Sequence, residues 1–258
     1  MQGSRNERGI WMARGGKGEE LVVLLHGIGA NAAAWQPLVA AIELRGTHRW
    51  LTLDFRGHGR SAMEGPYGYA AHAADVAHAL RDEAPATFTI LGHSFGGVIA
   101  ALVGSGWFGV VPKAVATIGV KLEWTDAEIA KVHDMASKPP RTFATRAEAI
   151  ERYLKGAGLF GLVDPAGEMA APGVREVPGG HQVAVDPRVF TAVGPPLERV
   201  FGLVSCPLRM AAGAKDPMVT LAAMQRIDPG AQLFDGLGHN AQVEAPATVL
   251  DFALSPAA

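Results

Sequence analysis

Short apolar runs alternate with segments of helical periodicity along most of this chain, and this alternation restricts the fold more than any other feature. The clearest run, Leu21 to Leu25, contains only leucine and valine, which is typical of a strand buried on both faces of a parallel sheet. Similar runs predict strands at residues 51–55, 88–91, 114–120, 208–212 and 232–234. Because helical segments separate these strands, we expect a mostly parallel, doubly wound α/β sheet with right-handed crossovers.

The alternation stops in the middle of the chain, where helical pieces occur without any run typical of a buried strand. Thr125 with Glu128 and Thr145 with Glu148 have the spacing of a capping box, so two helices are predicted to begin there. We expect a helical cap inserted into a single core. The predicted cap spans residues 121–195, and the predicted core spans residues 1–120 and 196–258.

Composition and charge argue against several classes of function. A formal charge of −2, without a long run of like charges, gives no field that would attract nucleic acid or anionic lipid. The single cysteine, Cys206, excludes an internal disulfide and a multi-cysteine zinc site. The first residues lack the apolar segment of a secretory signal, and no run is long enough to span a bilayer. We expect a cytoplasmic monomer or homodimer that acts on a small-molecule substrate without metal or cofactor and without binding nucleic acid or membrane.

The sharpest chemical signal is Gly-His-Ser-Phe-Gly-Gly at residues 92–97, which satisfies G-x-S-x-G between a predicted strand and a predicted helix. Such a turn holds a serine above the carboxyl end of the strand, at the start of a helix. Ser94 is therefore a candidate nucleophile. A glycine-rich turn with a capping serine is the alternative interpretation of the same residues.

A serine nucleophile requires a base and a group that orients the base. Among nine histidines, His239 follows the last predicted strand, and Asp216 follows the strand before it. Loops at the carboxyl ends of parallel strands meet at one edge of the sheet, and the order Ser, Asp, His is the one expected for this turn. Glu123 and Asp126 are alternatives for the acid.

Residues 26–29, His-Gly-Ile-Gly, follow the first buried strand and are predicted to supply half of an oxyanion hole. We expect the backbone amides of Ile28 and Phe95 to form this oxyanion hole together. The same segment fits a relaxed dinucleotide fingerprint, with Asp54 as the acid for a ribose. That alternative leaves Ser94 and its two predicted partners unexplained.

The inserted segment is expected to determine the substrate. His133 shares a predicted helical face with apolar neighbours, and it either faces a pocket or packs in the core; His181 is equally ambiguous. Aromatic side chains of the insertion are candidates to line an apolar site, although packing of the cap on the sheet is the alternative for each. The candidate pocket residues are Trp124, His133, Tyr153 and Phe160.

Taken together, these motifs resemble those of the α/β-hydrolase superfamily over nearly the whole chain. The matching segments, in order, are residues 26–27 with Trp35, residues 54–61, residues 92–97, residues 216–217 and residues 238–246. The resemblance implies an eight-stranded sheet with a cap after the sixth strand. It also implies that Ser94 is the nucleophile, His239 the base and Asp216 its orienting acid. Two departures are the short segment before Leu21 and the polar residues that follow His239.

The resemblance predicts a serine hydrolase that cleaves a small or medium carboxylic ester through an acyl-enzyme. Carbon–carbon bond hydrolases, enol-lactonases and thioesterases use much the same triad and remain alternatives. A ligand receptor of low turnover on the same fold is a further alternative, because a fold does not fix a function.

Overall fold

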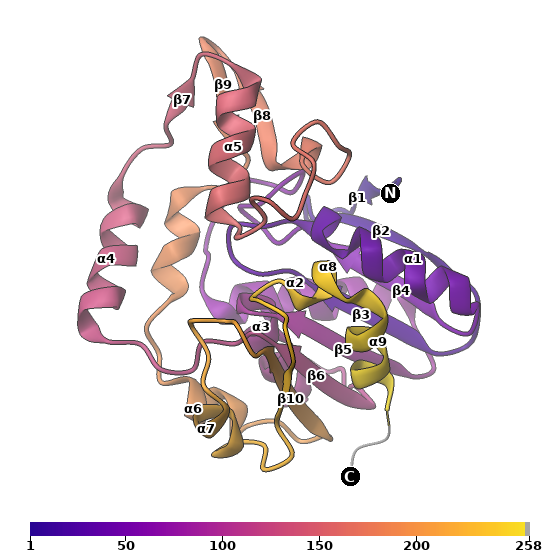
Figure 1. The fold of residues 1–258 in the computed structure, drawn as a ribbon. Helices are drawn as coiled ribbons and strands as arrows, with labels where there is room; N and C mark the ends of the chain where they lie inside the picture. The colour runs from indigo at the N-terminus through magenta and orange to yellow at the C-terminus, as the bar shows by residue number, and fades with distance from the viewer. Residues whose placement is uncertain (256–258) are drawn as a thin grey trace.

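An eight-stranded sheet forms the centre of the computed structural model, which describes residues 1–255 (Figure 1). The first three strands in sheet order pair antiparallel, and all other neighbours pair parallel. In sheet order the strands are β1 (Ser4–Arg5), β2 (Trp11–Gly16), β4 (Arg49–Leu53), β3 (Leu21–Leu25), β5 (Phe88–His93), β6 (Ala114–Ile118), β10 (Leu208–Gly213) and β11 (Gln232–Phe234). The predicted α/β class is confirmed, and the segment before β3 adds one strand of six residues and one of only two.

Helices cover both faces of the sheet, and the alternating side chains of the strands explain why. Along β3, Val22 and Leu24 pack into one core and Val23 and Leu25 into another. The first core contains α1 (Gln36–Arg45) and α9 (Pro246–Leu254), and α8 (Ala241–Glu244) packs against both of these helices. The second contains α2 (Tyr69–Glu83) and α3 (Phe95–Gly104), with α6 (Leu197–Phe201) and α7 (Leu221–Gln225) beside them. A strand without polar residues is therefore buried from both sides.

Local signals determine where the helix after β3 begins and ends. The Asn31 side chain accepts a hydrogen bond from the Ala33 amide at 2.9 Å and begins the 3-10 turn Ala32–Trp35, which leads into α1. Gly46 ends α1 in the left-handed conformation, with φ 65°. A short polar side chain satisfies free amides at the start of a helix, and glycine adopts positive φ at its end without strain.

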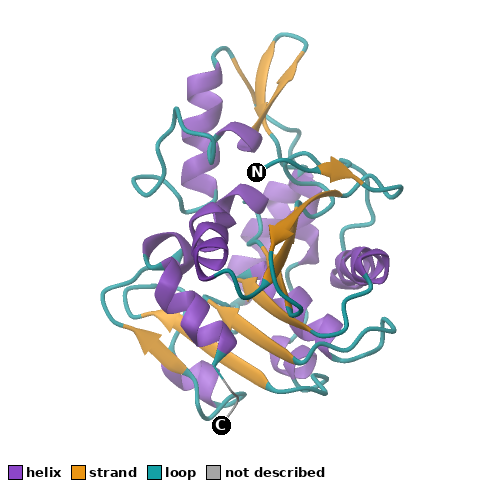
Figure 2. Ribbon diagram, turned by 90° about the vertical axis from the view of Figure 1, so that its right-hand side faces the viewer, coloured by secondary structure: helices purple, strands orange, loops and turns teal. Residues whose placement is uncertain are grey.

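The segment between β6 and α6 folds above the carboxyl edge of the sheet, as Figure 2 shows. Both predicted capping boxes are present, at the starts of α4 (Asp126–Ser137) and α5 (Arg146–Gly156). Besides the expected helices, the insertion contains a three-stranded antiparallel sheet of order β7-β9-β8, which the sequence did not indicate. Its elements are β7 (Thr142–Phe143), β8 (Val174–Val177) and β9 (Gly180–Val183), flanked by the 3-10 turns Ala171–Gly173 and Pro187–Ala192.

Polar contacts hold the insertion on the core. The Gly59 amide donates to Ala184 O at 2.7 Å, and the Tyr67 hydroxyl donates to the Asp186 carboxylate at 2.7 Å. No helix within residues 1–255 is both long enough and apolar enough to cross a membrane.

Candidate active site

Ser94 occupies a sharp turn between β5 and α3. Its φ of 50° and ψ of −117° lie outside the ordinary regions for a residue with a side chain, and its amide donates to Ile118 O at 2.9 Å. The turn closes only because its flanking residues are glycines. A Cβ at Gly92 would overlap the Gly96 carbonyl, and a Cβ at Gly96 would overlap the Leu25 carbonyl. Strain of this kind is stored at functional sites when the surroundings enforce it.

Asp216 and His239 meet beyond the ends of β10 and β11. His239 Nδ1 lies 2.7 Å from Asp216 Oδ2, and the Asp216 side chain is completely buried. Asp216 Oδ1 accepts a second hydrogen bond, from the Met218 amide at 2.9 Å. Because an ionised carboxylate only accepts, His239 Nδ1 carries the proton and donates it, which leaves Nε2 free to act as a base.

His93 fixes the backbone of the loop that carries His239. Its Nε2 donates to the His239 carbonyl oxygen at 2.9 Å, and the two imidazole centroids are 4.6 Å apart. Burial, the largest effect, holds the pKa of His93 well below its usual value, so the ring is neutral at pH 7. The serine turn and the histidine loop are therefore connected through the residue that precedes Ser94. Within residues 1–255 no hydrogen bond joins the Ser94 hydroxyl to His239 itself.

The loop at residues 26–29 lies against the serine turn. A Cβ at Gly27 would come within 2.8 Å of His93 Nδ1 and 3.3 Å of Ser94 Cβ, so only glycine allows this approach. Neither the Ile28 amide nor the Phe95 amide donates to another group in the described part of the chain. Within residues 1–255 both predicted oxyanion donors therefore lack a hydrogen-bond partner, and their role stays a prediction.

Two buried histidines, one within this loop and one in the 54–61 segment, connect the loop to that segment. His26 Nε2 accepts from the Phe55 amide at 2.9 Å, and His58 Nε2 accepts from the Gly29 amide at 3.1 Å. Each nitrogen accepts only if its ring is neutral. Burial lowers the pKa of His58 to about 4 and that of His26 well below its usual value. Sequence reasoning did not assign a role to either side chain.

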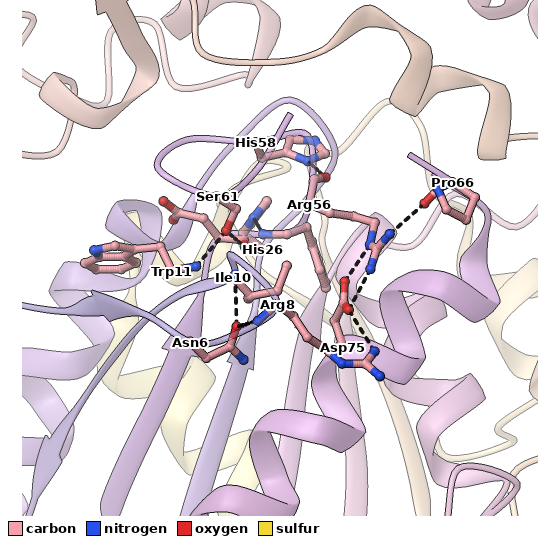
Figure 3. A network of polar contacts seen from close by, with 12 residues as sticks. Asn6, Arg8, Ile10, Trp11, His26, Arg56, His58, Ser61, Pro66 and Asp75 are labelled. Carbon is pink, nitrogen blue, oxygen red and sulfur yellow. Dashed lines mark hydrogen bonds and ion pairs between the residues drawn. The ribbon is translucent and has the colours of Figure 1, made fainter. Parts of the chain in front are cut away.

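Ion pairs hold the segment that supplies His58 (Figure 3). Arg56 makes a bidentate contact with the buried Asp75 carboxylate, at 2.6 and 2.7 Å, and Arg8 lies 3.6 Å from the same carboxylate. Asp54, the acid of the dinucleotide alternative, accepts from the Ala32 amide and pairs with Arg60, both at 2.8 Å. Because Asp54 is fully buried and already engaged, these contacts argue against a role in binding ribose.

The alternative acids lie elsewhere. Glu123 is exposed and pairs with Arg226 at 2.7 Å, and Asp126 begins α4. Of the predicted acids, Asp216 alone contacts His239 in the described part of the chain. Residues 1–255 contain no cluster of three histidine, cysteine or acidic side chains that would hold a metal ion.

The polar residues after His239 attach the insertion to the site. Asn240 Nδ2 donates to Gly158 O at 2.9 Å, and its Oδ1 accepts from Gln242 at 3.0 Å. Both side chains are buried. This departure from the expected apolar pattern thus fixes the end of α5 beside His239.

A cavity of about 580 Å³ lies among the elements of the insertion, next to the 26–29 loop. Of the four predicted pocket residues, Tyr153 lines it, while its hydroxyl accepts from Asn31 Nδ2 at 2.8 Å. Its remaining lining residues are Gly29, Met135, Lys138, Pro139, Pro140, Arg141, Phe143, Arg152, Gly156, Val183, Val185, Pro187 and Phe190.

The other three predicted pocket residues do not line this cavity. Trp124 packs against the core beside α6 and α7, and His133 Nε2 bonds to the Val193 carbonyl at 2.8 Å. Phe160 is 56% exposed and lies 5.0 Å from the Lys155 ammonium. His133 does not line the cavity because its ring faces Val193, near the end of the insertion. His181 pairs with Phe143 inside the small sheet.

Solved structures show the same fold. The thioesterase domain from the curacin biosynthetic pathway superposes with a TM-score of 0.81 over 99% of both chains, at 18% identity. E-2-(acetamidomethylene)succinate hydrolase superposes with a TM-score of 0.79 over 98% of both chains, at 21% identity.

Curated relatives match parts of the chain. It is 29% identical to protein phosphatase methylesterase 1 of Pongo abelii over 149 residues, which cover 55% of this chain and 38% of that protein. It is 38% identical to the pimeloyl-(acyl-carrier protein) methyl ester esterase of Vibrio vulnificus over 90 residues, 35% of this chain and 32% of that protein. The chain thus spans less than two fifths of these relatives' length. The model of the alpha/beta hydrolase family matches residues 22–252, and the chain belongs to that family.

Proposed function

We propose that this protein hydrolyses carboxylic esters, with Ser94 as nucleophile, His239 as base and Asp216 as the acid that orients it. The observation that carries the proposal is the hydrogen bond between His239 Nδ1 and the buried Asp216 carboxylate, on a loop that His93 ties to the serine turn. A capping serine alone would not require a neighbouring histidine and carboxylate arranged in this way.

In the proposed reaction, His239 Nε2 takes the proton of Ser94 as Oγ attacks the ester carbonyl. The carbonyl oxygen becomes negative and accepts hydrogen bonds from the Ile28 and Phe95 amides. His239 then returns the proton to the leaving alcohol, and Asp216 stabilises the imidazolium between these steps. Water, deprotonated by His239, releases the acid from the acyl-enzyme.

The names of the curated relatives favour an ester over the other substrates of such a triad, because two of them are methyl ester hydrolases. Carbon–carbon bond, enol-lactone and thioester substrates remain alternatives, since Ser94 and His239 would serve them in the same way. We further propose a cytoplasmic protein whose reaction uses neither metal nor cofactor.

The test is hydrolysis of a panel of p-nitrophenyl esters, thioesters and vinylogous diketones by the wild type and by Ser94→Ala. We expect kcat/KM on esters to fall at least about 10³-fold in the variant, by the scale of triad knockouts. Ser137→Ala, an exposed change on α4, is the matched control and should keep full activity. Comparable ester turnover in Ser94→Ala would contradict the proposal, and a single slow turnover in the wild type would favour a ligand receptor.

A further inference from the structure

We infer that the cavity of the insertion binds an anionic group at the far end of the substrate, so that the preferred esters carry a second, ionised terminus. This inference rests on the proposed function for its reaction, but its binding site is separate from the triad. It is carried by Arg141 and Arg152, which line a mostly apolar cavity that begins at the 26–29 loop.

Among the described residues that line the cavity, Gly29 alone comes from the core. Gly29 follows Ile28, and a Cβ on Gly29 would lie 3.6 Å from the Gly156 carbonyl at the end of α5. Two residues later, Gly158 accepts the hydrogen bond from Asn240, the neighbour of His239. The inner end of the cavity therefore adjoins the loop with the proposed oxyanion donor.

The charged residues of the lining are all cationic. They are Lys138, Arg141 and Arg152, and no aspartate or glutamate of the described residues lines the cavity. Lys138 already pairs with Asp134 at 2.5 Å. Within residues 1–255 neither Arg141 nor Arg152 makes an ion pair or a side-chain hydrogen bond, although Arg141 lies 4.8 Å above the Phe143 ring. Two guanidinium groups are thus available to a ligand.

The nearest acids are engaged with other partners. Arg141 and Arg152 also line a smaller hollow of about 230 Å³, together with Glu148, Glu151 and Lys155. Glu148 completes the capping box of α5, accepting from the Thr145 amide and hydroxyl, and Glu151 pairs with Lys155 at 2.5 Å. Hydrogen bonds from Thr145 and, after them, the charge of Arg141 lower the pKa of Glu148, so this carboxylate stays ionised near the arginines. Within residues 1–255, however, no ion pair or side-chain hydrogen bond joins Glu148 or Glu151 to either guanidinium, and both guanidinium groups can still form hydrogen bonds with a ligand.

Apolar walls with a few convergent polar groups are typical of small-molecule sites, and guanidinium binds carboxylate and phosphate by paired hydrogen bonds. A chain of methylene groups fits the apolar part of the lining, including Met135, Phe143 and Val183. The substrate class is therefore an ester whose acyl chain ends in a carboxylate or a phosphate. With the monomethyl ester of a dicarboxylic acid as substrate, the ester and water would give the dicarboxylic acid and methanol.

The first experiment compares kcat/KM for monomethyl esters of dicarboxylic acids of increasing length with the matching neutral dimethyl esters. A second arm uses methyl esters of hydroxy acids phosphorylated at the far end. We expect at least one anionic series to be preferred about tenfold, the effect of charge-assisted hydrogen bonds that are partly exposed. The series that is preferred identifies the anion. Salt raised to about 0.5 M should reduce the preference.

The double variant Arg141→Gln with Arg152→Gln should lose this preference: its kcat/KM should fall about tenfold more on the anionic ester than on the matching neutral diester. Arg146→Gln is the matched control, because Arg146 lies on the same helix as Arg152 but does not line the cavity. Equal rates on neutral and anionic esters in the wild type would overturn the inference, as would a preference that survives in the double variant.

A binding measurement separates failure of the inference from failure of the proposed function. Calorimetry with Ser94→Ala should detect the dianion of a dicarboxylic acid, and the affinity should fall about tenfold when Arg141 and Arg152 are also changed to Gln. Unchanged affinity would overturn the anion site even if ester hydrolysis stands. Retained hydrolysis by Ser94→Ala would instead contradict the proposed function alone.

Discussion

Two helices that lie beside the site differ sharply in how they are packed. All ten residues of α3, which follows Ser94, are buried, whereas α4 of the insertion buries only Ala136 among its twelve residues. The core fixes its loops by close backbone contact and buried hydrogen bonds. The insertion instead presents exposed charges around a cavity. This difference fits our proposals that the core holds the reacting groups and that the insertion binds the far end of the substrate.

The largest expected effect tests the core half of this comparison. In Asp216→Asn, the side-chain carbonyl can keep the Met218 hydrogen bond, but an amide N–H then faces His239 Nδ1. Nδ1 must accept, Nε2 keeps the proton, and the base is lost. We expect kcat to fall by about 10⁴, measured with a p-nitrophenyl ester. The control is Glu123→Gln, which changes the exposed alternative acid and should leave kcat unchanged. A larger loss of kcat in Glu123→Gln than in Asp216→Asn would show that Glu123, and not Asp216, is the acid.

Matched glycine substitutions test the difference in packing. A Cβ at Gly96 would overlap the Leu25 backbone, which cannot move without disturbing β3, so Gly96→Ala should lower the free energy of unfolding by about 3 kcal/mol. A Cβ at Gly156, the last residue of α5, meets nothing within 4 Å, and Gly156→Ala should raise that free energy by about 0.5 kcal/mol. Urea denaturation measures both. Equal effects would remove the contrast between core and insertion.

The free energy of unfolding should depend on pH through a histidine that is buried in the core. His72 packs between Phe55 and Phe95, with ring centroids 5.2 and 5.1 Å away, and burial lowers its pKa to about 3. The unfolded chain binds this proton near pH 6.5 and the folded chain does not. Stability is therefore complete above pH 6.5 and falls as the pH drops toward 3.

For His72 the loss reaches about 2 kcal/mol at pH 5, measured as the free energy of unfolding in urea relative to pH 7.5. His72→Leu keeps the apolar contacts and removes the proton site, so its stability should fall less steeply over this range. An identical slope in wild type and variant would show that His72 does not contribute to acid sensitivity.

Much of the core was predictable because each of its signals is local. Solid apolar runs such as Leu21 to Leu25 indicated parallel strands, and the G-x-S-x-G pattern at residues 92–97 indicated the serine turn. Ser94, Asp216 and His239 were selected because loops after parallel strands share one edge of the sheet. Their selection required the topology but no knowledge of side-chain contacts.

The insertion was harder to predict. Each residue of β9 is only partly buried, so its sequence lacks the apolar run that marked the core strands. Trp124 and Phe160 were chosen by residue type, and His133 was chosen because it shares a helical face with apolar neighbours. Neither criterion says which side of a helix or loop faces a cavity.

The sequence by itself determined the alternation of strands and helices, the strained serine turn and the order of the three candidate catalytic residues, because periodicity and glycine act over a few neighbouring positions. Only the tertiary structure decided that His93 holds the His239 loop, that Asn240 attaches the insertion, and that Arg141 and Arg152 share a cavity with Gly29. Those contacts join residues far apart in the chain. They depend on how packed elements meet, which no local pattern encodes.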